Sequence, residues 1–384
     1  LQVVMWFKLI AILLTPYVLA GMAISLALTR SPWPVGTVYG VDLLGAASGC
    51  LATLVLLSWA DAISALFAVA AFGALASFSF GVARNAAGPL RHPPFVLSAL
   101  GERKRAAMLA GVFAVVAIAN AAMQPTTQAN SWRHGLVLPL AKDELTFESP
   151  AVARWNTYSR ITAAEPSVGQ PRLWGPSPIT PSANVSQREL QIDGSAGTAM
   201  YAFDGDLSKL DFLRYDITNL AYAIRSQGRS AVIGVGGGRD LLSSYLFGFR
   251  DVTGVELNPI FVDLLTDEFR DYNRLADLPG VRFVVDEARS WFARTDERFD
   301  LIQMSLIDTW AATGAGAYSL SENGLYTTEA WQHFLSALTP TGVFTVSRWF
   351  STKDITETGR LISLAANALR DHGIDDVQAH LFLA

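Results

Sequence analysis

The stretch that decides the fold of the C-terminal half is Val232-Ile233-Gly234-Val235-Gly236-Gly237-Gly238-Arg239-Asp240. The β-branched run at 230–235 predicts a strand, the glycines predict a tight turn, and residues 240–247 predict a helix after it. Without side chains, the backbone of such a turn can approach a ligand and donate hydrogen bonds to it. Taken alone, the turn is explained equally well as an ordinary structural loop.

Strands and helices alternate beyond this turn. Strands are predicted at 251–255, 281–285, 299–304 and 342–348, and helices at 259–272, 288–293 and 328–338. A further helix is predicted before the turn, at 215–226. This alternation is typical of a parallel sheet that is covered on both faces, so we expect an α/β Rossmann-like domain.

Two acidic residues end the strands that follow the turn. Glu256 ends the second strand and Asp286 follows the third. Ligands of such sheets lie at the carboxyl ends of the strands, and an acid in the position of Glu256 is expected to bind ribose hydroxyls. Asp286 is placed to accept a hydrogen bond from an adenine amino group. The competing role for Glu256 is to cap the helix that begins near Pro259. The turn lacks the Lys-Ser/Thr ending of a phosphate-binding loop, which argues against nucleoside triphosphate hydrolysis but leaves NAD open.

The first third of the chain is largely apolar. Four runs, at 3–28, 38–59, 62–82 and 106–123, stand out. A transmembrane helix needs about 20 mainly apolar residues, which the first three runs provide and the fourth only marginally provides. Four successive runs are not explained by a signal peptide. We therefore expect N-terminal transmembrane helices and a lipid bilayer as a partner.

Composition excludes several classes of function. The chain has 384 residues, a net charge of −5 and one cysteine, Cys50, which lies within an apolar run. The acidic balance gives no support for a nucleic-acid partner, and one cysteine allows neither a disulfide framework nor a cysteine zinc site. The chain begins with leucine and stops after an apolar run, so we expect a fragment cut at both ends.

Three regions are expected. Residues 1–123 form the membrane region, 124–186 a linker and domain-entry segment, and 187–384 the nucleoside-binding domain. The segment 154–161 is either a strand or a piece packed over the later domain. Asp193-Gly194 ends an alternating run and predicts a small β-hairpin region before the sheet.

Charges near the apolar runs leave the orientation open. Arg30 lies in the first loop, and five basic residues lie between 84 and 105, on the same side if all four runs span. The positive-inside rule makes that side cytoplasmic and the C-terminal domain external, whereas a nucleoside made in the cytoplasm favours the opposite arrangement. Either one run does not span, or helices upstream decide the orientation, or the domain faces outward.

Several segments together resemble the spermidine synthase (aminopropyltransferase) family, whose domain has a class I methyltransferase fold. The whole chain is similar to bacterial membrane-embedded spermidine synthase-like proteins, which implies a location in the bacterial inner membrane. The segments that carry the resemblance are 39–46, 154–156, 193–194, 232–240, 255–259, 305–310 and 321–327.

The resemblance implies a role for each matching residue. Gly234, Gly236 and Gly238 form the cofactor loop, Glu256 binds the ribose, and Asp286 binds the adenine. Asp308 matches the second acid of a catalytic pair, and Tyr215 matches a tyrosine on the substrate side. Glu322 and Tyr326 either complete the pocket or are ordinary surface or packing residues.

Three positions depart from the family pattern. Ser305 stands where the family has the first catalytic acid, Gly237 where it has an aspartate in the glycine loop, and Gly197 where it has a glutamine. Aminopropyl transfer needs a neutral amine, and Ser305 cannot act as the base that provides it. Arg239 would suit a ligand carboxylate, or it is a surface residue or a partner of Asp240.

The leading hypothesis is therefore a membrane-anchored transferase that binds S-adenosylmethionine or its decarboxylated form, needs no metal and acts on a small amine, with a homodimer as a possible assembly. The first alternative is a non-catalytic module that binds polyamines or nucleosides, or that is coupled to transport. The second alternative is a methyltransferase that uses S-adenosylmethionine.

Overall fold

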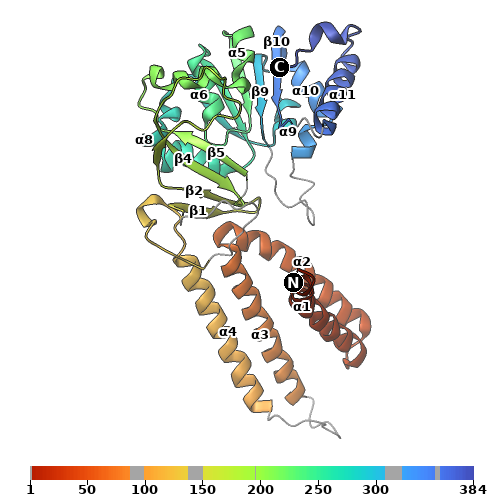
Figure 1. Ribbon diagram of the computed structural model, residues 1–384. Coiled ribbons are helices and arrows are strands. Elements are labelled where there is room, and N and C mark those ends of the chain that lie inside the picture. Colours follow the sequence, from red (N-terminus) through yellow and green to blue (C-terminus); the bar gives the residue numbers. More distant parts are fainter. Residues whose placement is uncertain (1, 87–98, 137–149, 195, 308–321, 351–354) are drawn as a thin grey trace.

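The computed structural model describes residues 2–86, 99–136, 150–194, 196–307, 322–350 and 355–384. Figure 1 shows a group of long helices below and a domain that contains two sheets above.

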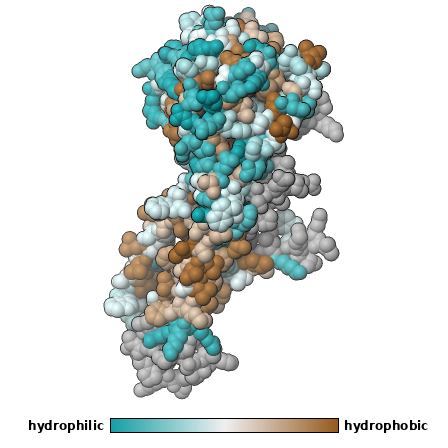
Figure 2. Space-filling model, turned by 90° about the vertical axis from the view of Figure 1, so that its left-hand side faces the viewer, coloured by the Kyte–Doolittle hydropathy of each residue, from teal (hydrophilic) through white to brown (hydrophobic). Residues whose placement is uncertain are grey.

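The apolar N-terminal runs form four helices, as predicted. These are α1 (Gln2–Arg30), α2 (Val35–Trp59), α3 (Ala62–Ala86) and α4 (Ala99–Ala122). Each contains a stretch long and apolar enough to cross a membrane, including the fourth, where that stretch is Arg103–Ala122 with 20 residues. The fourth run reaches this length because its helix begins before the apolar residues. Apolar side chains cover much of the surface of these helices, in contrast to the domain above (Figure 2).

The helices form two pairs. α3 packs along α4, and Phe67 of α3 stacks with Phe113 of α4 at 6.3 Å between ring centroids. α2 contacts strand β1 of the domain and joins α3 through Ala60 and Asp61. The connection from α1 to α2 therefore lies at the end of these helices away from the domain (Figure 1).

A buried polar cluster joins the helices beside the domain. Asp61 precedes α3, is 4% exposed and accepts hydrogen bonds from the backbone amides of Ile63 and Ser64. The amide of Asn120 in α4 donates to Asp61 at 3.1 Å and to the Ser64 hydroxyl at 3.0 Å. The Asn120 carbonyl accepts from the backbone amide of Leu136 at 2.6 Å. This cluster fixes the start of α3 against the end of α4.

The chain next forms an antiparallel sheet of five strands. They are β1 (Val152–Trp155), β2 (Arg160–Ala163), β3 (Ser167–Gly169), β4 (Val185–Ile192) and β5 (Ala196–Tyr201), in the order β1-β2-β4-β3 with β5 beside β4. The predicted Asp193-Gly194 hairpin turn connects β4 to β5, with both residues at positive φ. The sheet is larger than the expected hairpin region, and the expected boundary at 187 falls within β4.

The second sheet is parallel. Its strands are β6 (Arg229–Ile233), β7 (Asp251–Glu256), β8 (Val281–Val285), β9 (Phe299–Ser305) and β10 (Leu338–Ser347), in the order β10-β9-β6-β7-β8. All five were predicted to within a few residues. The chain starts at the central strand β6, adds β7 and β8 on one side, and then adds β9 and β10 on the other. The switch point of this doubly wound sheet lies between β6 and β9.

Helices cover both faces of the parallel sheet, and two hydrophobic clusters fill the space between. The predicted helices appear as α6 (Arg239–Leu246), α7 (Pro259–Asp263) with a π-helical turn (Leu264–Glu268) and α8 (Arg270–Asn273), α9 (Ala288–Phe292), and α10 (Thr328–Ser336). α11 (Thr356–Asp371) was not predicted. Short 3-10 turns cover Gln128–Asn130, Leu275–Asp277, Glu322–Leu325 and Val377–His380.

The prediction of one continuous helix at 215–226 is wrong. The region consists of the 3-10 helices η2 (Leu207–Tyr215) and η3 (Ile217–Asn219), followed by the single turn α5 (Ala221–Ile224). Asp216 interrupts the helix because its carboxylate accepts the backbone amide and the hydroxyl of Thr218, at 3.1 and 2.9 Å. Such local side-chain bonds compete with helical hydrogen bonds.

Candidate functional site

The glycine turn lies at the carboxyl end of the central strand β6. Gly234, Gly236 and Gly238 have φ values of 79°, 50° and 81°, which residues with a Cβ rarely adopt. Gly234 donates its amide to the carbonyl of Val255 at 2.9 Å, and Gly238 precedes the first turn of α6. The structure thus places all three predicted glycines beside the switch point.

At Gly237, close packing against strand β5 requires a glycine. A Cβ at this position would lie 2.7 Å from the carbonyl carbon of Ala199 and 3.0 Å from the amide nitrogen of Met200, both in the backbone of β5. Strand β5 of the antiparallel sheet therefore closes over the turn at this point. The aspartate expected here from the family pattern has no room.

Glu256 ends β7 and holds the turn in place. One carboxylate oxygen accepts the amides of Val235 at 2.9 Å and Gly236 at 3.1 Å, and the other accepts the amide of Asn258 at 2.9 Å. Burial raises the pKa of Glu256, and these backbone amides oppose the rise. The amide of Leu257 opposes the rise as well, so four backbone amides face the carboxylate and a ligand hydroxyl would have to share or displace one of them. Pro259 starts α7, but Asn258 caps that helix, so the competing capping role falls to Asn258.

Asp286 follows β8 and lies next to Glu256. Its backbone amide donates to the carbonyl of Glu256 at 3.0 Å, so the two acids extend from the same edge of the sheet. The Asp286 carboxylate accepts the amide of Glu287 at 2.8 Å and pairs with Arg294. Its side chain is 29% exposed and that of Arg294 is 65% exposed, so this ion pair contributes little and leaves Asp286 accessible to a ligand.

Ser305 ends β9, across the switch point from the turn. Its hydroxyl accepts a hydrogen bond from the side-chain amide of Gln303 at 2.9 Å. Burial raises the pKa of the Asp240 carboxyl, whereas Arg239 and the hydrogen bond from Ser305 lower it. The next residue, Leu306, has a φ of 47°, which is strained for a residue with a side chain, and its amide donates to the carbonyl of Ser347 in β10 at 3.0 Å.

Arg239 is not directed toward a ligand, contrary to the interpretation that it binds a carboxylate. It is 4% exposed and pairs with Asp216 at 2.8 Å and with Asp240 at 2.7 Å. It also donates to the Thr218 hydroxyl at 3.2 Å. The alternative in which Asp240 is its partner is confirmed, but in a buried cluster rather than at the surface.

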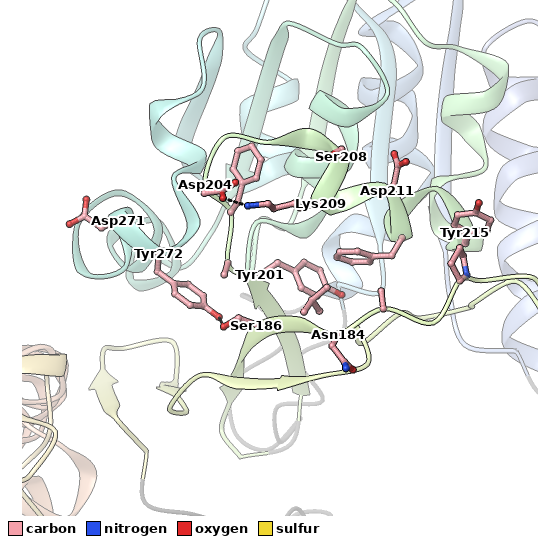
Figure 3. A pocket seen from close by; sticks show the side chains of 16 residues that line it. Asn184, Ser186, Tyr201, Asp204, Ser208, Lys209, Asp211, Tyr215, Asp271 and Tyr272 are labelled. Atoms are coloured by element: carbon pink, nitrogen blue, oxygen red, sulfur yellow. Dashed lines mark hydrogen bonds and ion pairs between the residues drawn. The ribbon is translucent and has the colours of Figure 1, made fainter.

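Tyr215 lies apart from Ser305. It ends η2 and lines a cavity of about 730 Å³ between the β4–β5 hairpin, η2 and α8 (Figure 3). Among the described residues that line the cavity, none belongs to the glycine turn, and Glu256, Asp286 and Ser305 are also not among them. The rim carries Asp204 paired with Lys209, and Asp211 paired with Arg214, so most of its charge is already neutralised.

Three further residues were expected at the site. Asp308 and the side chain of Glu322 lie outside the described residues. Tyr326 is described, and its hydroxyl accepts from Arg348 at 3.2 Å. Within the described ranges, no group of three or more His, Cys, Asp or Glu residues could hold a metal ion.

A group of buried polar residues near the glycine turn was not predicted from the sequence. These are Asp216, Tyr222 and Gln303, all buried, around the pair formed by Arg239 and Asp240. One signal was available, because Gln303 is a polar residue inside the apolar strand Phe299–Ser305. The role of Asp216 had no local signal, since its partner Arg239 lies 23 residues away.

Comparison with solved structures finds similarity to spermidine synthases and methyltransferases. Spermidine synthase from Thermotoga maritima is 14% identical with a TM-score of 0.31, over 62% of this chain and 75% of that chain. Human methyltransferase-like protein 13, solved in complex with SAH, is 18% identical with a TM-score of 0.29, over 40% and 71% of the two chains. No protein-family model matches this sequence, and no curated protein does. The similarity concerns the methyltransferase-like fold alone.

Proposed function

We propose that this protein is a membrane-anchored transferase that binds S-adenosylmethionine or its decarboxylated form and acts on a small amine. The observation that carries the proposal is the position of Glu256. Its carboxylate holds the glycine turn through the amides of Val235 and Gly236 and lies at the carboxyl edge of the sheet. This is where doubly wound sheets bind nucleosides.

Each described residue of the edge has a role in this proposal. The glycine turn lets its backbone approach the ligand closely, Glu256 accepts a ribose hydroxyl, and Asp286 accepts the adenine amino group. The positive φ values of the glycines and the exposure of Asp286 support these roles.

The transfer step needs an amine that has lost its proton, because a protonated amine has no lone pair to attack the carbon beside the sulfonium. Ser305 is no base at neutral pH. Asp308, three residues beyond β9, remains the candidate to hold or deprotonate the amine. Tyr215 is the weaker candidate, because Ser305 is not among the described residues that line the cavity at Tyr215.

The four apolar helices are the proposed membrane anchor, in the inner membrane of a bacterium. Their lengths and the exposed apolar side chains of α1 and α2 support this. In water, an apolar surface of this size would drive association, whereas lipid would cover it.

Isothermal titration of the full chain in detergent micelles tests the ligand. We expect S-adenosylmethionine or its decarboxylated form to bind, and Glu256→Gln to weaken the affinity about tenfold or more. Asp251→Asn is the matched control, because it removes a carboxylate from the opposite end of the same strand, where Asp251 pairs with Arg229.

The outcomes separate the three hypotheses. If neither form of the ligand binds, both transferase hypotheses are wrong. A strong preference for the form with a carboxylate contradicts aminopropyl transfer and favours a methyltransferase. Binding of the decarboxylated form without turnover of any amine favours the non-catalytic module, in which Ser305 has replaced the acid.

A further inference from the structure

The hairpin of strands β1 and β2 lies between the apolar helices and the rest of the domain (Figure 1). Its turn contacts the segment that directly follows Glu256. Asn156 donates its side-chain amide to the side-chain oxygen of Asn258 at 2.7 Å, and Asn258 donates to the Ser159 hydroxyl at 2.9 Å. Asn258 is 6% exposed and Ser159 is 9% exposed, so these hydrogen bonds are largely shielded from water.

Backbone amides determine which end of each asparagine side chain is the oxygen. The amides of Tyr158 and Ser159 can only donate, and both point to the same side-chain atom of Asn156, at 2.9 and 3.1 Å. That atom is therefore the oxygen, and the NH₂ group of Asn156 faces Asn258. The amide of Ile260 fixes Asn258 in the same way, since it donates to the Asn258 oxygen at 3.1 Å. The hydrogen bond between the two asparagines therefore has one possible direction.

Asn258 is also a partner of Glu256. Its backbone amide donates to one oxygen of the Glu256 carboxylate at 2.9 Å, while the other oxygen accepts the amides of the glycine turn. The carboxylate is thus oriented from two sides, by the glycine turn and by the residue that Asn156 holds. Because Asn156 lies outside the parallel sheet, the hairpin sets part of the geometry at the carboxyl edge of that sheet.

The same hairpin is attached to the end of α4. Arg154 in β1 donates to the carbonyl of Thr126, which lies shortly after α4, at 2.7 Å, and pairs with Glu268 at 2.5 Å. Glu268 ends the π-helical turn that follows α7, and it also accepts the backbone amide of Gln128 at 2.7 Å. The side chains of Arg154 and Glu268 are 19% and 11% exposed, so their ion pair is better shielded from water than a surface pair. The helical segment that Asn258 caps is therefore held at both ends.

We propose that the β1–β2 hairpin connects the end of α4 to the nucleoside site, with Asn156 as the positioning residue that acts on Glu256 through Asn258. The affinity for the adenosyl ligand then depends on a strand outside the parallel sheet and on the attachment of that strand to the proposed membrane anchor. This inference rests on the proposed function, in which Glu256 binds the ribose. It also gives separate roles to Arg154, which holds the end nearest α4, and to Asn156, which holds the site.

The test is titration of S-adenosylmethionine and its decarboxylated form into the full chain in detergent micelles. Asn156→Asp keeps the turn, because a carboxylate oxygen still accepts the amides of Tyr158 and Ser159, but it places a second acceptor against the Asn258 oxygen. We expect this variant to weaken the affinity about fivefold at neutral pH. Asn367→Asp is the matched control, since it adds the same charge at an exposed position of α11 and should leave the affinity unchanged.

A pH profile separates positioning from a loss of structure. When the carboxylate introduced by Asn156→Asp takes up a proton, toward about pH 4, it becomes a donor to Asn258, so the affinity deficit relative to the wild type should shrink. A deficit caused by local unfolding would not recover in acid. Asn156→Ser is the second variant, because its hydroxyl can accept the turn amides but is too short to reach Asn258. Its deficit should not change with pH relative to the wild type.

Arg154→Ala tests the attachment to α4. It removes the bonds to Thr126 and Glu268 and leaves Asn156 in place, and we expect the affinity to fall about threefold. Arg282→Ala is the matched control, because it removes the ion pair with Glu297 near the start of β8 and should leave the affinity unchanged. Melting curves of all variants report whether each one folds.

Unchanged affinity in the folded Asn156 variants would overturn the positioning role, and unchanged affinity in Arg154→Ala would overturn the attachment. Because Asn156 acts through Glu256, adding Asn156→Asp to Glu256→Gln should weaken binding no further, and additive losses would contradict the inference. A wild type that binds neither form of the ligand refutes the proposed function and the inference with it. A wild type that binds, with variants that bind equally well, refutes the inference alone.

Discussion

At the scale of single residues, Gly237 and Glu256 show how contacts with neighbouring backbone fix the position of the glycine turn. We expect Gly237→Asp to lower the free energy of unfolding by about 1–3 kcal/mol, because the side chain would meet the backbone at Ala199. Chemical denaturation of the full chain in detergent measures this. Gly169→Asp in β3 is the control, since nothing lies within 4 Å of its Cβ position. Equal losses in the two variants would contradict a steric cause.

Glu256 makes stability depend on pH in a predictable direction. Burial raises its pKa in the folded chain above the ordinary range of glutamic acid. Between the ordinary and the raised value, the folded chain keeps a proton that the unfolded chain releases, so the free energy of unfolding falls as pH rises. The stability advantage of the wild type over Glu256→Gln should be largest near about pH 4 and should shrink toward neutral pH. Denaturation of both proteins across this range measures the difference, and an advantage that grows with pH would show that the pKa is lowered instead.

At the scale of elements, the buried cluster around Arg239 connects η2 and η3 to α6. Asp216 is 3% exposed and bonds to Arg239 at 2.8 Å and to the amide of Trp174 at 2.9 Å. We expect Asp216→Ala to lower the free energy of unfolding by about 3 kcal/mol or more, because it leaves a buried charge with one partner fewer.

The control for this change lies in the same element. Asp211 of η2 is 65% exposed and pairs with Arg214 at 3.0 Å, so Asp211→Ala should change stability by less than about 1 kcal/mol. Melting temperatures of the two variants, compared with the wild type, provide the measurement. Similar shifts in both would mean that the cluster does not stabilise the domain.

These elements also show what local sequence can predict. The five parallel strands were predictable because each is a short apolar run between turn residues, and Glu256 and Asp286 follow from the strand ends. The break at Asp216 comes from local bonds to Thr218 and was not predicted, whereas the pairing of Asp216 with Arg239 could not be, because folding alone brings these two residues together. The helix α11 did carry a signal. Its apolar residues Leu361, Leu364, Ala365 and Ala368 repeat at helical spacing and belong to the hydrophobic cluster around Phe292, Phe299 and Phe334.

At the scale of the whole molecule, the four helices determine which parts share a side of the membrane. The short α1–α2 connection and the start of α4, which carries Arg103, Lys104 and Arg105, lie at the end opposite the domain (Figure 1). Residues 30 and 84–105 together carry six basic residues, which the positive-inside rule places in the cytoplasm. An adenosyl ligand made in the cytoplasm requires the domain there instead. Four spanning helices cannot satisfy both conditions.

Cysteine labelling in intact cells decides between them. With Cys50, the only cysteine, replaced by serine, Ser31→Cys reports the α1–α2 connection and Ser182→Cys reports an exposed position in the domain. We expect a membrane-impermeant maleimide to label one of the two and not the other, because four spans place them on opposite sides. Labelling of both before lysis would mean that one apolar helix does not cross. If only Ser182→Cys is labelled, the domain faces outward, and a cytoplasmic co-substrate could not reach it. If only Ser31→Cys is labelled, the domain faces the cytoplasm as the proposed transferase requires, and segments outside these four helices must override their loop charges.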